Sequence, residues 1–177
     1  MDARKIHEAL LNRKEKVCHR SEIVELIKEY KKKFRSTIRI TDSVKYLSRH
    51  NYITRIFKGY YYLNSIDEQK RGYRSFEDRE LLFIVLNKLK MGWYVGLSSA
   101  MHYSGKSWQV PSVTSIVNGD IAGEKNILGI KVRFSKLKKL STDGLKKSKT
   151  RNNIPFYYSL PKKTASDTAY LKWYGKR

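Results

Sequence analysis

The stretch "NYITRIFKGYYYLN", residues 51–64, decides the fold that the sequence predicts for the first part of the chain. β-Branched and aromatic residues lead up to Lys58 and Gly59, and three tyrosines lead away from them. Residues of these types favour β-strands, and a glycine readily adopts the positive φ that a two-residue hairpin turn needs. The stretch therefore predicts a β-hairpin with its turn at Lys58-Gly59.

The two faces of this hairpin follow from the length of the turn. With a two-residue turn, Ile56 faces Tyr61 and Thr54 faces Leu63 across the strands. The other face then carries Arg55, Phe57, Tyr60 and Tyr62. Since lysine is uncommon in a two-residue turn, a three-residue turn with a bulge is the alternative.

Three segments with helical periodicity precede the hairpin. Apolar residues recur at helical spacing over residues 2–14 and 22–34, and Ser21 is well placed to cap the second segment. Thr41 is placed to cap a third, short helix over residues 42–50. Three helices followed by a hairpin is the order of a winged helix-turn-helix, whose third helix enters the major groove of DNA.

The rest of the chain predicts a linker and a second domain. Residues 66–75 are polar and contain a glycine, which indicates a linker between a winged helix over 1–65 and a domain over 76–177. In the second domain we expect helices over 76–90, 98–105 and 162–177, and strands over 110–120, 126–137 and 154–161. The predicted fold class is α+β, with an N-terminal winged helix-turn-helix followed by a small mixed α/β C-terminal domain.

Positive charge is the dominant feature of the composition. The 177 residues include 38 Lys and Arg against 16 Asp and Glu, which gives a net charge of +22. Residues 1–64 carry 16 basic and 7 acidic side chains and residues 125–177 carry 15 and 2, whereas residues 65–124 carry 7 of each. Isolated charges usually mean only a solvated surface, but two concentrated basic blocks favour binding to a polyanion such as nucleic acid.

The motifs of the common enzyme classes are absent from the sequence. There is no HExxH, CxxC, GxGxxG or GxSxG motif, Cys18 is the only cysteine, and the four histidines are scattered. Gly105-Lys106-Ser107 matches the end of a phosphate-binding loop, but Ala100 stands where that motif needs its first glycine. We therefore expect no enzymatic activity, no metal and no cofactor.

The charged N-terminus and the lack of a long apolar span bear on the compartment. Neither a secretory signal nor a 20-residue apolar stretch is present in the sequence. We expect a cytoplasmic, nucleoid-associated protein that does not enter a membrane.

Three patches of the sequence resemble the AbiEi family, the antitoxin half of the type IV AbiEi/AbiEii toxin–antitoxin pair. Residues 43–64 are similar to the family's recognition helix and wing, including Gly59 and Tyr61, and residues 76–105 are similar to its segment after the linker. A Ser-x-Pro-x-x-Thr-x-x-Asp pattern of the family is matched by Ser159, Pro161, Thr164 and Asp167. The resemblance implies an N-terminal domain that represses the protein's own promoter and a C-terminal domain that counters a nucleotidyltransferase toxin.

The predicted DNA contacts lie in and around the third helix and in the hairpin. They are Arg39, Thr41, Ser43, Lys45, Arg49, Arg55, Lys58 and Tyr60. Side chains of the helix would read base edges in the major groove, whereas Arg55 and Lys58 in the wing would contact phosphate. For each of these residues a solvated surface position is the alternative.

A second set of candidate nucleic-acid contacts follows in the second domain. It consists of Lys131, Arg133, Lys136, Lys138 and Lys139. These residues could extend the DNA footprint, contact RNA, or contact the nucleic-acid substrate of a toxin.

The sequence thus predicts a sequence-specific double-stranded DNA-binding transcriptional regulator, an autorepressor and antitoxin of an AbiE-type system. Its expected partners are promoter or operator DNA, with inverted repeats where two copies bind, and a nucleotidyltransferase toxin; we expect a monomer or a homodimer on DNA. The main alternative is an RNA-binding or ribosome-associated basic protein without promoter specificity. An enzyme acting on nucleic acid is a further rival, which the few, scattered carboxylates disfavour.

Overall fold

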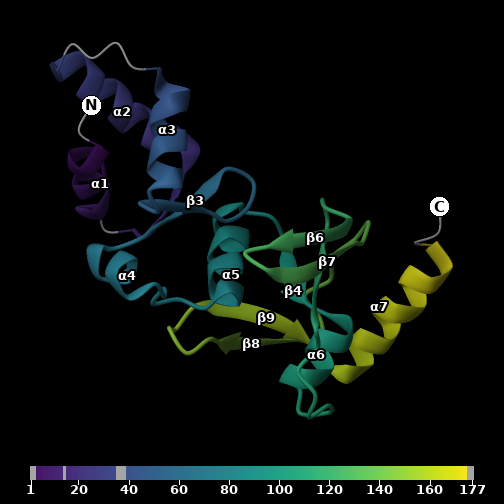
Figure 1. The fold of residues 1–177 in the computed structure, drawn as a ribbon. Coiled ribbons are helices and arrows are strands. Elements are labelled where there is room, and N and C mark those ends of the chain that lie inside the picture. The colour runs from purple at the N-terminus through teal and green to yellow at the C-terminus, as the bar shows by residue number, and fades with distance from the viewer. Residues whose placement is uncertain (1–2, 14, 35–38, 175–177) are drawn as a thin grey trace. The chain divides into compact units, whose positions relative to one another are not determined.

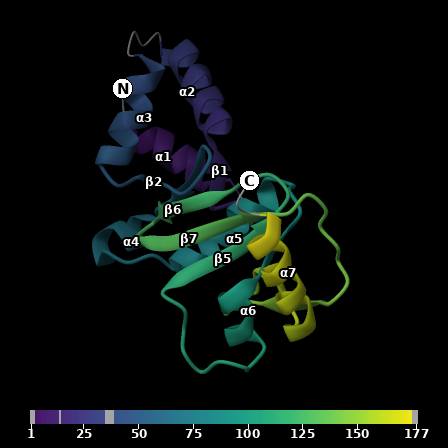
Figure 2. The ribbon, with the colours of Figure 1, turned by 90° about the vertical axis from the view of Figure 1, so that its right-hand side faces the viewer.

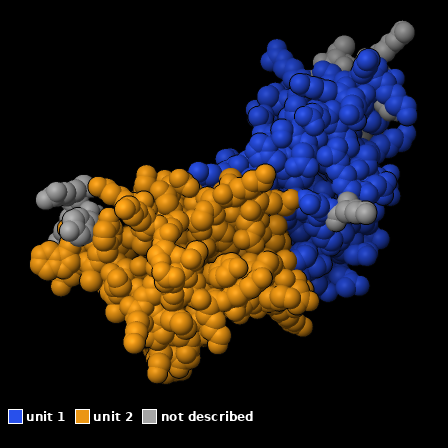
Figure 3. Space-filling view, turned by 180° about the vertical axis from the view of Figure 1, so that it is seen from behind, with its two compact units in different colours: residues 1–77 blue, residues 78–177 orange. Residues whose placement is uncertain are grey.

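The fold is a mixed α+β fold built as two compact units. A computed structural model describes residues 3–13, 15–34 and 39–174 of the chain. Residues 1–77 form the first unit and residues 78–177 the second (Figure 3). The described residues contain seven helices and two β-sheets.

The first unit places three helices against a three-stranded sheet (Figure 1). Its elements in chain order are α1 (Ala3–Leu11), β1 (Val17–His19), α2 (Arg20–Phe34), α3 (Ile40–Arg49), β2 (Ile53–Arg55), β3 (Tyr60–Leu63) and α4 (Ile66–Arg71). The apolar stripes of the helices and one face of the sheet share one core, which contains Ile6, Leu10, Ile23, Ile27, Leu47, Ile53 and Leu63. Burial of each such side chain contributes roughly 1.5–3 kcal/mol, so this core holds the helices on the sheet.

The three predicted helices are present, but their first residues differ from the prediction. Residues 2 and 14 of the first predicted helix lie outside the described residues. Ser21 lies within the first turn of α2 and not at its cap, because Glu22 Oε1 accepts a hydrogen bond from the backbone N–H of His19 and fixes the start of the helix (2.8 Å). In α3 the cap position belongs to Arg39, which makes no side-chain capping bond, and Thr41 lies inside the helix.

The hairpin is present with its bulged turn, which was the alternative at the sequence level. Lys58 and Gly59 both have positive φ, at 45° and 82°. The Tyr60 N–H donates to the carbonyl of Phe57, and the Ile56 N–H donates to the carbonyl of Tyr60, each at 2.9 Å. Phe57 is therefore an extra residue on the first strand, as in a β-bulge.

The bulge shifts the register by one residue, so the predicted facing pairs are wrong. The observed pairs are Ile53↔Leu63, Thr54↔Tyr62 and Arg55↔Tyr61. Arg55 consequently shares a face with Tyr61 and not with Tyr62, since a slip of one residue moves a side chain to the other face. Tyr62 is fully buried on the opposite face.

A third strand that the sequence analysis missed completes this sheet. β1 pairs antiparallel with β3 along its whole length, with Cys18 opposite Tyr61, and the strand order is β1-β3-β2. Three residues are too few to show an alternating pattern, and the strand forms because β3 offers it a free edge.

The predicted linker over residues 66–75 contains helix α4, which the sequence analysis did not predict. Ser65 accepts a hydrogen bond from the Glu68 N–H, and the Glu68 carboxylate accepts one from the Ser65 N–H, which is a capping box. Gly72, with φ at 73°, ends the helix in the left-handed conformation. The spacing of Ser65 and Glu68 is the sequence signature of this capping box, although the polar composition of the segment favours a linker.

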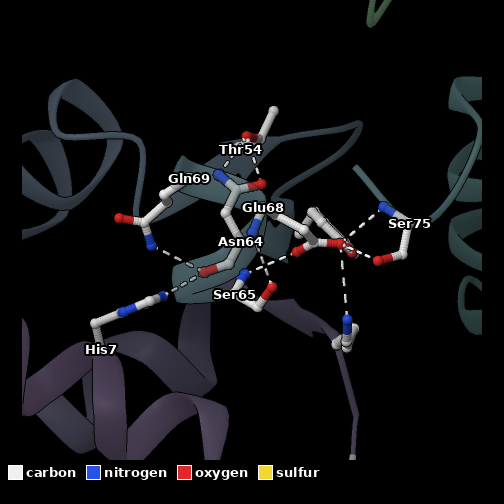
Figure 4. Close-up of polar contacts among 9 residues, drawn as sticks. His7, Thr54, Asn64, Ser65, Glu68, Gln69 and Ser75 are labelled. Carbon is white, nitrogen blue, oxygen red and sulfur yellow. Dashed lines mark hydrogen bonds and ion pairs between the residues drawn. The ribbon is translucent and has the colours of Figure 1, made fainter. Parts of the chain in front are cut away.

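Glu68 is also the centre of a buried polar cluster (Figure 4). Its Oε1 accepts hydrogen bonds from the Tyr62 hydroxyl (2.6 Å), the Ser75 N–H (2.7 Å) and the Ser75 hydroxyl (2.5 Å). Its Oε2 accepts the Ser65 N–H (2.7 Å), and Lys16 Nζ lies 3.7 Å from Oε1. One carboxylate thus joins the hairpin, the cap of α4, the segment before β1 and the segment after α4.

These donors determine the charge state of the cluster. Burial alone would raise the pKa of Glu68, but the hydrogen bonds from Ser75, Tyr62 and Ser65 favour the carboxylate and lower the pKa from 4.5 to about 2. Burial and the neighbouring carboxylate raise the pKa of Tyr62, so its hydroxyl keeps the proton that it donates.

Asn64 extends the polar cluster toward α1 (Figure 4). Its carbonyl lies 2.7 Å from His7 Nε2, and its side-chain amide donates to the Asn51 carbonyl (2.7 Å) and the Thr54 hydroxyl (2.9 Å). Burial lowers the pKa of His7, so the neutral ring donates this bond at neutral pH. The bonds fix the end of β3 to α1 and to β2.

The second unit is built on a six-stranded mixed sheet (Figures 1 and 2). Its elements are α5 (Asp78–Lys88), β4 (Trp93–Val95), α6 (Leu97–Tyr103), β5 (Val113–Asn118), β6 (Gly123–Ile127), β7 (Ile130–Lys136), β8 (Leu145–Lys149), β9 (Pro155–Ser159) and α7 (Pro161–Tyr174). The strand order is β6-β7-β5-β4-β9-β8, in which β5 pairs parallel with β7 and β4 pairs parallel with β9.

Helices cover both faces of the sheet at β4 and β9. On one face Phe83 of α5 packs against the rings of Trp93 and Phe156, at 5.1 and 5.0 Å between centroids. On the other face the Tyr94 hydroxyl donates to Asp167 of α7 at 2.7 Å. Adjacent residues of a strand point to opposite faces, so Trp93 and Tyr94 bind one helix each.

A side chain of helix α6 bonds the backbone of β5 beyond the end of β4. The Ser99 hydroxyl donates to the carbonyl of Val113 (3.1 Å) and accepts from the N–H of Ser115 (2.9 Å). These are backbone groups of β5 beyond the last residue of β4, Val95. The serine side chain satisfies groups that would otherwise lack a ladder partner.

The Ser-x-Pro-x-x-Thr-x-x-Asp residues form the base of α7. Pro161 is the first residue of the helix, where its missing N–H costs nothing. The hydroxyls of Ser159 and Thr164 lie 2.7 Å apart, and Asp167 accepts the Tyr94 bond with Lys163 Nζ 3.5 Å away. The buried pattern therefore attaches α7 to the sheet.

The strands predicted at β5, β7 and β9 are present, whereas β4, β6 and β8 were not predicted as separate strands. In β7 the inward Val132 and Phe134 are buried and the outward Lys131 and Arg133 are exposed, as the alternation predicts. Strand β8 lies at the sheet edge and consists mostly of lysine and serine. Lysines on an edge strand discourage pairing with other chains. They also leave the strand without the apolar alternation by which a strand is predicted from sequence.

We expect Glu68→Gln to destabilise the first unit by about 2 kcal/mol at pH 7, because neutral glutamine cannot replace charge-assisted hydrogen bonds. The folded pKa of about 2 lies below the ordinary 4.5, so the stabilisation is complete above pH 4.5 and is lost as the pH falls through 2. Hydrogen exchange of residues 60–77 measures both effects.

The difference between wild type and Glu68→Gln should shrink as the pH falls from 4.5 to 2. Asp67→Asn is the matched control, since it neutralises an exposed carboxylate in the same helix turn and should change the exchange little. A difference that stays constant over this pH range would contradict the role given to the Glu68 charge.

Candidate nucleic-acid interface

One row of polar side chains runs along the solvent face of α3. Thr41, Lys45 and Arg49 are all exposed and recur every four residues, so they lie above one another on the helix. The opposite side of the helix is fixed by Val44 and Leu47, which are buried in the core of the first unit. The packing that holds α3 therefore directs this row into solvent.

Ser43 does not belong to this surface, so its prediction as a base contact is wrong. The side chain is 1% exposed, and its hydroxyl donates to the Arg39 carbonyl at 3.2 Å. A serine hydroxyl often bonds the carbonyl four residues earlier when it lies inside a helix. Arg39 itself is exposed immediately before α3.

Tyr46 is part of the exposed surface of α3 although the sequence analysis did not select it. It is 46% exposed, and its ring centroid lies 4.0 Å from that of His50, one turn further along. Its exposure could have been predicted from the helical periodicity, because Tyr46 falls outside the apolar stripe that Val44 and Leu47 define.

The hairpin presents two cations on a packed base. Lys58 at the turn and Arg55 on β2 are exposed, whereas Ile56 and Phe57 next to the turn are buried. Tyr60, a predicted DNA contact, is only partly exposed.

The base of the turn is tightly packed. The ring of Tyr60 lies edge-on against His19 at 5.0 Å. His19 Nε2 would also lie 2.9 Å from a Cβ added to Gly59, and the Arg20 N–H donates to the Gly59 carbonyl (2.8 Å). The turn is thus held from beneath by the end of β1.

The five basic candidates of the second unit do not form one surface. Lys131 and Arg133 are exposed on one face of β7, and Glu124 of β6 pairs with Arg133 at 2.6 Å. Lys136 falls on the opposite face by the two-residue period of the strand. Lys138 and Lys139 follow the strand and line a separate cavity of about 440 Å³ together with Lys163 and Asp167.

No three His, Cys, Asp or Glu side chains of the described part of the chain are placed to hold a metal ion. A search of the same residues finds no helix with the length and apolar character that crossing a membrane requires.

No protein-family model and no curated protein matches this chain. The resemblance to the AbiEi family therefore rests on the residues quoted above and remains a prediction.

We expect Gly59→Ala to destabilise the first unit more than Gly72→Ala. Both glycines have positive φ, at 82° and 73°, which costs an alanine roughly 1–2 kcal/mol. Only at Gly59 would the new Cβ also press on His19, whereas the space around Gly72 is open. Thermal unfolding of both variants measures the difference, and equal losses would mean that the His19 ring yields without cost.

Proposed function

We propose that the first unit is a winged helix-turn-helix that binds duplex DNA and that the protein is a sequence-specific transcriptional regulator. The order α1-β1-α2-α3-β2-β3 supports this reading, since three helices and a hairpin are the parts of that fold. The observation that carries the proposal is the exposed row of Thr41, Lys45 and Arg49 on α3, in a chain with a net charge of +22.

The proposed mechanism divides affinity from specificity. Helix α3 enters the major groove, where Lys45 and Arg49 donate to guanine O6 and N7; each good bidentate contact to a base adds roughly 1–3 kcal/mol of discrimination. Arg55 and Lys58 of the hairpin contact phosphates, which fix the position of the protein and carry no sequence information. Arg39, which precedes α3, reaches a phosphate or a base at the N-terminal end of the helix.

The biological role that we propose follows from the resemblance to the AbiEi family. The protein would repress its own promoter, as one copy or as two copies on inverted repeats, and would counter a nucleotidyltransferase toxin. The second unit would supply the antitoxin function. We propose no catalytic step for either unit.

RNA binding without promoter specificity is the second candidate function. It is favoured by the second unit, which carries 19 basic and 6 acidic residues and thus a net charge of +13. Titration of the protein with duplex DNA from its own upstream region, a scrambled duplex and RNA at matched salt decides between the two. Tighter binding to the natural duplex than to the scrambled one, persisting as salt rises, supports the regulator; equal binding of the two duplexes together with tighter binding of RNA supports the alternative.

We expect Lys45→Ala and Arg49→Ala each to reduce the preference for the natural duplex over the scrambled one about tenfold, because each removes a base contact. Lys70→Ala is the matched control, since Lys70 is an exposed lysine of the same unit on α4. Fluorescence anisotropy with both duplexes measures the ratio. An unchanged ratio in both α3 variants would mean that this helix does not read the sequence.

We expect Lys58→Ala to weaken binding to both duplexes equally and to lower the slope of log K against log salt by about 0.9, which corresponds to one lost phosphate contact. The ratio between the duplexes should stay constant. A changed ratio would place Lys58 against a base, and an unchanged slope would remove the hairpin tip from the DNA contact.

A further inference from the structure

Trp108 is the most exposed large apolar side chain among the described residues. It lies between the end of α6 and the start of β5 and is 88% exposed, and Val110 in the same loop is 63% exposed. Figure 2 shows the course of this loop. The loop leaves α6 in a fixed direction, because the N–H groups of Lys106 and Ser107 both donate to the carbonyl of Met101. Single exposed apolar residues are common, so the meaning of Trp108 depends on its surroundings.

A groove beside Trp108 supplies these surroundings. Residues 107–113, Ser98 and Arg133 line a cavity of about 740 Å³, which we call the Trp108 groove. The volume lies within the range of roughly 300–1,000 Å³ that is typical of ligand sites. An indole and a guanidinium therefore border one open space.

The sheet face next to this groove is basic and polar. In register, Arg133 of β7 stands between Ser115 of β5 and Glu124 of β6, and its neighbour on this face is Lys131. Glu124 Oε1 accepts a hydrogen bond from Arg133 Nε at 2.8 Å and forms an ion pair with Nη2 at 2.6 Å. This pair orients the guanidinium along one edge and leaves 55% of the side chain exposed.

We propose that the Trp108 groove binds single-stranded nucleic acid, with a base stacked on Trp108 and the adjoining phosphates bound by Arg133 and Lys131. An exposed aromatic ring beside cations is the arrangement that binds single strands, because every unpaired base offers a flat face and every linkage a negative charge. The bases of a duplex are stacked on one another and offer no such face. The charge of the second unit, +13, complements a polyanion.

This site is independent of the duplex-binding surface proposed for the first unit. It uses other residues, another unit and stacking instead of groove insertion. Its failure would leave the proposal for α3 intact, and the reverse also holds.

The test is the affinity of the full chain for a labelled single-stranded 12-mer of RNA and of DNA. We expect Trp108→Ala to weaken binding about tenfold or more, as loss of one base–aromatic stack does, and Trp108→Phe to retain most of the affinity. Trp173→Ala is the matched control, since Trp173 is 78% exposed on α7 and outside the groove. Equal effects of Trp108→Ala and Trp173→Ala would overturn the proposal.

Salt dependence separates stacking from charge. Trp108→Ala should leave the slope of log K against log salt unchanged, whereas Lys131→Ala should lower it by about 0.7, the value for one phosphate of a single strand. Binding of duplex DNA should not change in either variant by more than in Trp173→Ala. The proposal fails if Trp108→Ala weakens duplex binding as much as single-strand binding, or if light scattering shows that it instead disrupts an association between copies of the chain.

Discussion

The buried carboxylate of Glu68 is the interaction on which the first unit most depends. A buried charge is stable only when its oxygens are satisfied, so the positions of Tyr62, Ser65 and Ser75 are set by one group. Tyr62 lies in the central strand of the sheet, between β1 and β2. The hydrogen bond from its phenol to Glu68 therefore fixes the position of the hairpin, whose turn carries the exposed Lys58.

Periodicity and turn chemistry predicted much of this fold, and the failures have separate physical causes. The three helices, the hairpin and the alternation in β7 follow from patterns that extend over many residues. The hairpin register does not, because it depends on whether Lys58 adopts a positive φ and makes Phe57 a bulge. The burial of Ser43 could not be predicted either. Serine is usually exposed, but here its hydroxyl can be buried because it donates a hydrogen bond to the carbonyl of Arg39. The basic residues of the candidate sites could be predicted from the sequence. Trp108 could not be selected, because only the fold places it on the same groove as Arg133, which is distant in the sequence.

Both units carry excess positive charge, but they present it in different settings. In the first unit the cations lie on a helix and a hairpin turn, shapes that fit the grooves and backbone of a duplex. In the second unit Lys131 and Arg133 lie on a sheet face beside an indole, a setting that suits unpaired bases. Positive charge attracts any nucleic acid, so under the two proposals the discrimination between duplex and single strand has to come from these shapes.

The same arrangement of three side chains stabilises each unit against this charge. A strand tyrosine donates to a helix carboxylate with a lysine nearby: Tyr62, Glu68 and Lys16 in the first unit, and Tyr94, Asp167 and Lys163 in the second. In a chain with only 16 acidic residues, loss of either carboxylate removes hydrogen bonds and also adds to the repulsion among 38 basic groups. Salt screens that repulsion between exposed groups but reaches buried pairs much less. Added salt should therefore weaken the proposed binding of nucleic acid while it stabilises the fold, so a loss of that binding at high salt would not be explained by unfolding.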